Sequence, residues 1–236
     1  MTTLYLRLHL QSDTTFGRGD GVAGWIDAEV EYDEYGLPFL RGRALKGLLV
    51  EECAHLLFSL RRQEIDTSEN SVWWQAAQKL WGRGGSGLQD DGGVIVGDAC
   101  LPDELRQACR VACEKGELTP QEILASLTAM RRQTALAANG APLPESLRNM
   151  RVVLRENVFE APLWLEFTPD SVASGLLAAC VKSLRRVGTG RNRGRGKVST
   201  RLSDEAWDGT QAEVFTQTAL LKFQATVPTQ PTEAKV

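Results

Sequence analysis

The sequence predicts an α+β domain whose strands and helices follow the order βαββαβ. Residues 4–10 alternate apolar and polar, residues 45–60 carry a leucine stripe, and residues 172–184 carry a second apolar helical face. Alternation is typical of a half-buried strand, and apolar residues three and four apart are typical of a helix. The expected order is that of a ferredoxin-like (RRM-type) domain, here with a long first loop and an inserted hairpin.

Composition limits the function classes. The chain has 236 residues, of which 42% are hydrophobic and 24% charged, as in ordinary globular proteins. We expect one domain over residues 1–227, with an insertion at about 101–155 and a disordered tail at 228–236. No apolar run approaches the ~20 residues of a membrane span, so we expect no membrane partner and a cytoplasmic location. The net charge of −3 argues against nucleic-acid binding over the whole surface and requires any such binding to be local.

The cysteines are odd in number and scattered. The sequence has 5 of them, without a C-x-x-C pair, which favours reduced and partly buried thiols. A zinc site is the alternative, because Cys109 and Cys113 share a helical spacing and Cys53 lies close to His55.

The first strand carries its leucines on one face. Its other face combines an aromatic ring, a cation and an imidazole (Tyr5, Arg7 and His9), which suits RNA or an ordinary solvent face equally well. The chain then loses periodicity from Gln11 to Leu40, and a loop of this length inside a domain is typically functional.

The helix after this loop begins with cations. Arg41, Arg43 and Lys46 lie at its N-terminal end, where they oppose the helix dipole, so we expect a negatively charged partner there. The other expected elements are a loop at 63–71, a helix at 72–80, a glycine-rich turn at 81–93, a strand at 94–96, helices at 103–116 and 120–130, a protruding hairpin from 131, strands at 152–154 and 161–167, a helix at 171–184, and strands at 197–203 and 218–227.

The most informative stretch runs from Val187 to Lys197, VGTGRNRGRGK, and is called the Gly/Arg loop below. Glycines alternate with cations, and no Asp or Glu occurs between Asp170 and Asp204. Glycine lets backbone N–H groups approach a ligand, and a guanidinium is a planar fork that suits phosphate. A polyphosphate backbone, most simply a nucleic acid, is the predicted ligand, and a solvated flexible loop is the alternative.

Several of these stretches occur together in a known family. "LPFLRGRALKG", "LWGRGG", "VGDA" and the Gly/Arg loop, in that order after a long glycine-rich loop, resemble the RAMP superfamily of CRISPR-associated proteins. The similarity covers about Leu4 to Arg201 and is greatest to the repeated backbone subunit of type III effector complexes. It departs from the pattern at Arg43-Ala44-Leu45-Lys46, where Ser-Ser-Leu-Lys is commoner, and at the bulky Trp25.

The resemblance implies an antiviral ribonucleoprotein whose partners are a guide (CRISPR) RNA, a target RNA and other effector subunits. It implies a thumb-like hairpin at about Arg131 to Arg155, and a single Asp in the first loop that promotes cleavage of target RNA with Mg²⁺ or Mn²⁺. Asp27 fits that place, as catalytic residue and metal ligand, with Asp20 and Asp33 as alternatives. The implied RNA-binding residues are Arg41, Arg43, Lys46, Arg131, Arg132, Gly188, Gly190, Arg191, Arg193, Gly194, Arg195 and Lys197.

Three functions stay open at the level of sequence. The first is a backbone subunit that binds guide RNA and cleaves target RNA. The second is a non-catalytic RNA-binding subunit of the same complex. The third is a guide-processing endoribonuclease, which would rely on a histidine, and only His9 and His55 are available.

Overall fold

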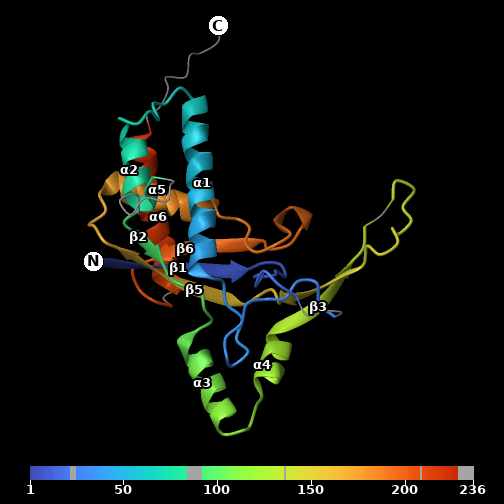
Figure 1. The fold of residues 1–236 in the computed structure, drawn as a ribbon. Coiled ribbons are helices and arrows are strands. Elements are labelled where there is room, and N and C mark those ends of the chain that lie inside the picture. The colour runs from blue at the N-terminus through green and yellow to red at the C-terminus, as the bar shows by residue number, and fades with distance from the viewer. Residues whose placement is uncertain (22–24, 84–91, 136, 208, 228–236) are drawn as a thin grey trace.

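The computed structural model describes residues 1–21, 25–83, 92–135, 137–207 and 209–227. The predicted tail at 228–236 and most of the predicted glycine-rich turn lie outside the described residues. In chain order the elements are β1 (Thr2–Leu10), α1 (Gly42–Arg62), α2 (Val72–Trp81), β2 (Val94–Val96), α3 (Asp103–Glu114), α4 (Pro120–Leu127), β3 (Thr128–Gln133), β4 (Arg148–Val153), β5 (Val158–Leu165), α5 (Ser171–Ser183), a 3₁₀ turn (Arg191–Arg193), β6 (Val198–Ser203) and α6 (Gly209–Thr226) (Figure 1).

The main sheet has the strand order β2-β5-β1-β6, and every neighbouring pair is antiparallel. Its central strand β1 buries all four leucines of the predicted apolar face, which are at most 6% exposed. Helices α1, α2 and α5 lie on one side of this sheet, and α3 and α4 lie on the other side (Figure 1). The backbone N–H of Leu202 donates to Thr216 Oγ1 of α6 at 2.8 Å, so α6 covers the outer edge of β6.

Helix α1 begins at Gly42, a position that only glycine fits. A Cβ at this position would lie 2.1 Å from the carbonyl oxygen of Val96. The N–H of Gly42 has no partner within the helix and donates to the Asp98 carboxylate at 2.7 Å, so Asp98 of the "VGDA" stretch caps the first helix.

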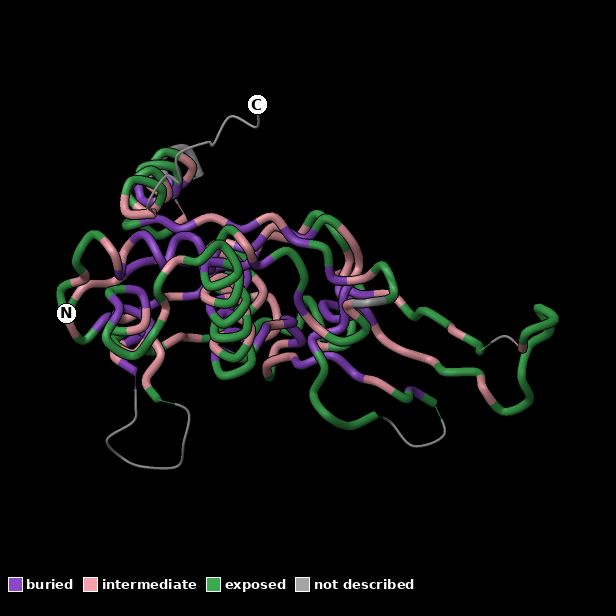
Figure 2. Tube along the Cα trace, turned by 90° about the horizontal axis from the view of Figure 1, so that it is seen from above, coloured by how far each residue is buried: buried purple, intermediate pink, exposed green. Residues whose placement is uncertain are grey.

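A second sheet consists of β3 and β4 alone. This β3–β4 hairpin projects from the body, and its far end is mostly exposed (Figures 1 and 2). Its base is held by the first loop: Thr14 pairs antiparallel with Val153, and Ala28 pairs parallel with Met150. The loop at 11–40 therefore extends the hairpin as well as connecting β1 to α1.

The α+β class and most of the predicted elements are confirmed. Helix α4 ends at Leu127, three residues before the predicted end, because Thr128 enters β3. The predicted strand at 218–227 is wrong, since these residues belong to helix α6. Ala212, Thr216 and Ala219 are buried along one face of that helix, a spacing that outweighs the short apolar run read as a strand.

All five cysteines are free thiols, and those of Cys53 and Cys180 are buried. Among the described residues, no three His, Cys, Asp or Glu side chains gather as a metal site. Within the same part of the chain, no helix is long and apolar enough to cross a membrane.

Candidate nucleic-acid interface

The Gly/Arg loop is closed at its neck by backbone hydrogen bonds. The N–H of Val187 donates to the carbonyl of Gly196 at 2.9 Å, and the N–H of Gly196 donates to the carbonyl of Asp13 at 3.1 Å. A Cβ at Gly196 would lie 1.9 Å from the carbonyl oxygen of Val187, and one at Gly188 would lie 2.4 Å from Thr14 Oγ1. Both neck glycines are therefore required by close packing.

The two glycines farther out serve a different purpose. Gly190 and Gly194 flank the 3₁₀ turn with φ of 73° and 80°, and a Cβ on either would meet open space. They are left-handed positions that reverse the chain. Together the four glycines give Arg191 to Lys197 a compact turn.

The cations of this loop are not equally available. The Arg191 guanidinium donates to Glu51 of α1 at 3.0 Å. Arg195 is partly buried and donates to the sulfur of Met150. Its pKa is lowered, mainly by burial and also by repulsion from Arg131. Arg193 and Lys197 are exposed, and neither has an ion pair with another described residue.

The loop meets one face of the hairpin. Arg131 and Met150 are cross-strand partners, as are Gln133 and Arg148, so these four side chains share a face. That face and the Gly/Arg loop enclose two grooves of about 600 and 570 Å³. The residues lining them are Gln133, Thr134, Ala135, Ser146, Arg148, Met150, Gly188, Thr189, Gly190, Arg191, Arg193 and Arg195.

Asp13 joins the two structures. Its carboxylate accepts from the Arg131 guanidinium at 2.8 Å and from the Arg155 N–H at 3.2 Å, while its carbonyl accepts from Gly196. A further groove of about 600 Å³ lies over this junction, and three arginines (Arg131, Arg155 and Arg195) and two acids (Asp13 and Glu156) are among the residues that line it. Six arginines line these three grooves, which together are called the loop face below. Such a concentration of guanidinium groups is the kind of surface that suits a polyanion.

Asp27 lies at the edge of β4 that does not pair with β3, where its own N–H donates to the carbonyl of Asn149 at 2.8 Å. Its Oδ2 accepts from the backbone N–H of Asn149 at 2.7 Å, and its Oδ1 lies 3.8 Å from the Arg148 guanidinium. Because Arg148 also lines the loop face, Asp27 is adjacent to the grooves. Its side chain is 43% exposed, so the carboxylate is open to a ligand.

The alternative aspartates of the first loop have structural partners. The Asp20 carboxylate pairs with Arg18 at 2.7 Å. The Asp33 carboxylate accepts from the N–H groups of Tyr35 and Leu37, which makes it a turn residue. All three carboxylates thus have partners, and Asp27 differs in that its partner Arg148 lines a groove of the loop face.

The opposite face of the hairpin carries a buried ion pair. Glu29 and Arg151 are 2.8 Å apart, with side chains 3% and 14% exposed. The Arg151 guanidinium also lies 5.9 Å from the centre of the Trp25 ring. Arg132 alternates with Arg131 along β3 and so belongs to this opposite face rather than to the loop face.

The start of α1 has internal partners. Arg41 pairs with the buried Glu31 at 2.6 Å, which raises the pKa of Arg41, and Asp98 caps the helix. The protein itself therefore supplies negative charge at this helix end. Arg43 is exposed and has no ion pair with another described residue. Lys46 lies five residues before Glu51, which places it about 7.5 Å away along the helix axis and about 140° around it. Neither Arg43 nor Lys46 lines a groove of the loop face.

The two histidines do not line the grooves, although His9 contacts Glu156, which lines the groove over Asp13. His9 Nε2 is 3.2 Å from Glu156, and His55 is exposed on α1, 3.9 Å from Glu52. Neither lines a groove of the loop face.

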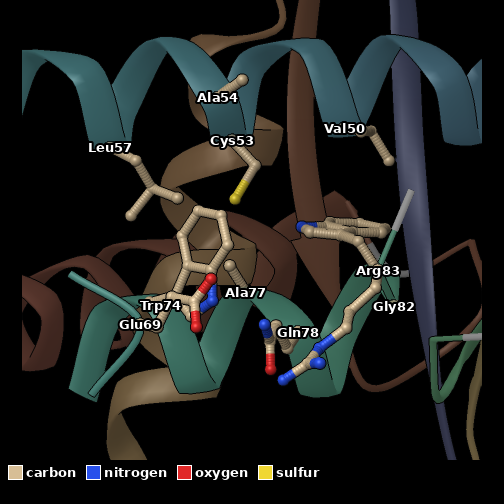
Figure 3. A pocket seen from close by; sticks show the side chains of 11 residues that line it. Val50, Cys53, Ala54, Leu57, Glu69, Trp74, Ala77, Gln78, Gly82 and Arg83 are labelled. Carbon is tan, nitrogen blue, oxygen red and sulfur yellow. The ribbon is translucent and has the colours of Figure 1, made fainter. Parts of the chain in front are cut away.

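Another cavity differs in chemistry. It measures about 410 Å³, lies between α1 and α2, and Figure 3 shows Val50, Cys53 and Leu57 along its upper wall with Trp74 and Ala77 opposite. Glu69 and Arg83 both line it, so its charges are mixed. We therefore do not assign this cavity to RNA.

The residues thus define a mixed α+β fold with a cationic face built from two distant parts of the chain. No protein-family model matches the sequence, and no curated protein matches it. The fold is similar to a chain in a cryo-EM structure of a type III-B Cmr-beta complex in its apo state, with 14% identity, a TM-score of 0.57 and coverage of 85% of this chain and 97% of that chain. It is also similar to a chain of the Cmr-beta complex bound to cognate target RNA, with 12% identity, a TM-score of 0.59 and coverage of 86% and 97%. At such identities the similarity shows a shared fold.

Proposed function

We propose that this chain is an RNA-binding subunit of a type III CRISPR effector complex, specifically a RAMP-type backbone subunit that binds guide RNA and cleaves the bound target RNA. One observation carries the proposal. The Gly/Arg loop shares grooves with one face of the hairpin, and Asp27 lies at the edge of β4, a strand of the same hairpin. The chains that share the fold come from structures of a type III-B Cmr-beta complex, and one of these structures is bound to cognate target RNA.

A ferredoxin-like sheet is part of this proposal. The strand order β2-β5-β1-β6 with antiparallel neighbours supports it, if β3 and β4 are counted as an insertion. The hairpin then corresponds to the thumb, and the insertion at about 101–155 contains α3, α4 and both hairpin strands.

The loop face would hold the guide backbone. Exposed Arg193 and Lys197 offer charge to phosphates, and the positive-φ turns at Gly190 and Gly194 bring backbone groups close to a strand. Arg195 and Arg131, positioned by Met150 and Asp13, form the wall of the groove.

At the edge of the hairpin, Asp27 would act on the scissile nucleotide. A carboxylate there can accept a hydrogen bond from a ribose 2′-hydroxyl and orient its oxygen toward the phosphorus, while Arg148 faces the charge that develops on the phosphate. The Asn149 N–H fixes one carboxylate oxygen and leaves the other open.

The residues fit a divalent cation only in part. Magnesium commonly takes one or two carboxylates together with substrate phosphates and water, and Asp27 can supply one such carboxylate. Mg²⁺ or Mn²⁺ held by Asp27 and RNA phosphates would supply charge stabilisation of the phosphorane. No additional carboxylate cluster among the described residues would hold the ion before RNA arrives.

The deciding experiment uses the assembled complex and a labelled target RNA with magnesium or manganese. Asp27→Asn keeps an oxygen acceptor for the Asn149 N–H and removes the charge. We expect the cut facing this subunit to disappear in both Asp27→Asn and Asp27→Ala, while target affinity changes by less than about 1 kcal/mol.

The control is Asp20→Asn, which removes a neighbouring loop carboxylate that pairs with Arg18. Undiminished cutting in both Asp27 variants would leave the second function, a non-catalytic RNA-binding subunit. Loss of cutting together with loss of target binding would show that Asp27 maintains the shape of the loop.

A further inference from the structure

We propose that Trp25 is a binding platform for one unstacked nucleobase, next to Asp27. The inference deepens the proposed function, on which it rests. Trp25 is 60% exposed, which is unusual for the largest apolar side chain in a folded protein. It precedes Asp27 by two residues, so their Cα atoms are at most about 7 Å apart.

The Trp25 side chain and backbone are held by residues of β4. The Arg151 guanidinium lies 5.9 Å from the ring centre, and that guanidinium is itself fixed by the buried Glu29 at 2.8 Å and by Thr128 at 3.4 Å. The backbone carbonyl of Trp25 accepts from Asn149 Nδ2 at 3.2 Å. A ring held by a buried ion pair and a backbone contact loses little freedom when a ligand stacks on it.

Its location indicates the ligand. The loop face on one side of β4 is lined by arginines, Asp27 lies at the edge, and Trp25 contacts Arg151 on the opposite side. A single RNA strand that crosses this edge has phosphates on the loop face and must break its base stack at the bend. The exposed base then has an aromatic face available within one nucleotide of the carboxylate.

Stacking of this kind tolerates any base because every base has a π-face, so the platform would select an unpaired nucleotide rather than a sequence. Unstacking also frees the sugar–phosphate torsions that a 2′-hydroxyl needs to reach an in-line position. The structure therefore assigns Trp25 the role of a positioning residue for the scissile nucleotide.

The test uses the full-length protein with two probes of equal length, an oligoadenylate and an abasic ribose-phosphate chain. The variants are Trp25→Ala, Trp25→Phe and, as a matched control, Phe58→Ala, which removes an aromatic side chain 62% exposed on α1. We expect Trp25→Ala to weaken oligoadenylate binding on the order of ten-fold and to leave the abasic chain unchanged. Trp25→Phe should retain part of the affinity, and Phe58→Ala should behave as wild type.

A second readout is the tryptophan fluorescence lost in Trp25→Phe relative to wild type. Oligoadenylate at saturation should quench that difference signal, whereas the abasic chain should not. Equal weakening of both probes by Trp25→Ala would overturn the inference, since Trp25 would then only shape the loop.

Two further results would also overturn it, and they separate it from the proposed function. If Arg193→Ala weakens both probes but Trp25→Ala weakens neither, the protein binds RNA without the platform. If Trp25→Ala changes only the oligomeric state in sedimentation, the indole contacts protein. A wild-type protein that binds neither probe would refute the proposed function as well.

Discussion

Single substitutions in the Gly/Arg loop should weaken RNA binding unequally. Arg193 has no ion pair with another described residue, whereas Arg191 is already neutralised by Glu51 at 3.0 Å. We therefore expect Arg193→Ala to remove a full phosphate contact. Arg191→Ala should have a smaller effect, because its contact with RNA competes with an internal one.

The magnitude follows from counterion release. Each phosphate contact on a single strand contributes about 0.7 to the slope of log K against log salt. Between roughly 50 and 200 mM salt, the loss of affinity is therefore about 2.6-fold smaller for a protein that has one phosphate contact fewer. Replacing Arg191, Arg193 and Arg195 together should lower the slope by up to about two, the value for three full contacts, which is up to roughly 16-fold over the same interval.

Glu51→Gln provides a test in the opposite direction. Removing the carboxylate releases Arg191 from its pair on α1, so we expect RNA affinity to rise and the slope to steepen. The assay is fluorescence anisotropy of a labelled RNA at four or more salt concentrations. An unchanged slope in the triple variant would refute contact between this loop and the phosphate backbone.

The remaining predictions concern the hairpin. Replacing residues 134–147 by Asn-Gly should leave the free energy of unfolding within about 1 kcal/mol, because Gln133 and Arg148 face each other at a register that a two-residue turn can close. This variant should still bind RNA but disturb how a guide–target duplex is divided, and an unfolded product in circular dichroism would contradict it. Glu29→Ala should lower the free energy of unfolding in urea by about 3–5 kcal/mol, since it leaves Arg151 buried without its partner; a loss below about 1 kcal/mol would show that the pair does not stabilise the hairpin base.

Local sequence patterns were sufficient to predict most of the fold. The alternation at residues 4–10 and the leucine stripe of α1 both depend on one element burying one face, and both are confirmed. The strand predicted at 218–227 failed for a related reason. Its apolar residues belong to a longer helical pattern that begins at Ala212, and a ten-residue window did not include it.

The candidate site was only partly accessible from sequence. Alternating glycines and arginines predicted a phosphate-binding loop, because that signal lies within eleven residues. The contacts that decide which cations are available join distant parts of the chain, such as Arg191 with Glu51 and Arg151 with Glu29. Neither pair leaves a local pattern, so sequence reasoning missed Glu29 and Arg151 as the support of the hairpin base. It also missed Asp98 as the acid at the start of α1.

The distribution of ion pairs explains how an acidic protein can present a cationic face. Many basic side chains elsewhere have carboxylate partners, among them Arg18, Arg41, Lys79, Arg106, Lys182 and Arg201. At the Gly/Arg loop, Asp13 is the acid at the junction, and it divides its carboxylate between the Arg131 guanidinium and the Arg155 N–H.

Asp13 therefore positions these cations more than it neutralises them. Because its carbonyl also accepts from Gly196 at the neck of the loop, the Gly/Arg loop and the hairpin cannot move independently without breaking that junction. A polyanion bound in the grooves would stabilise the same arrangement that Asp13 holds in the free protein.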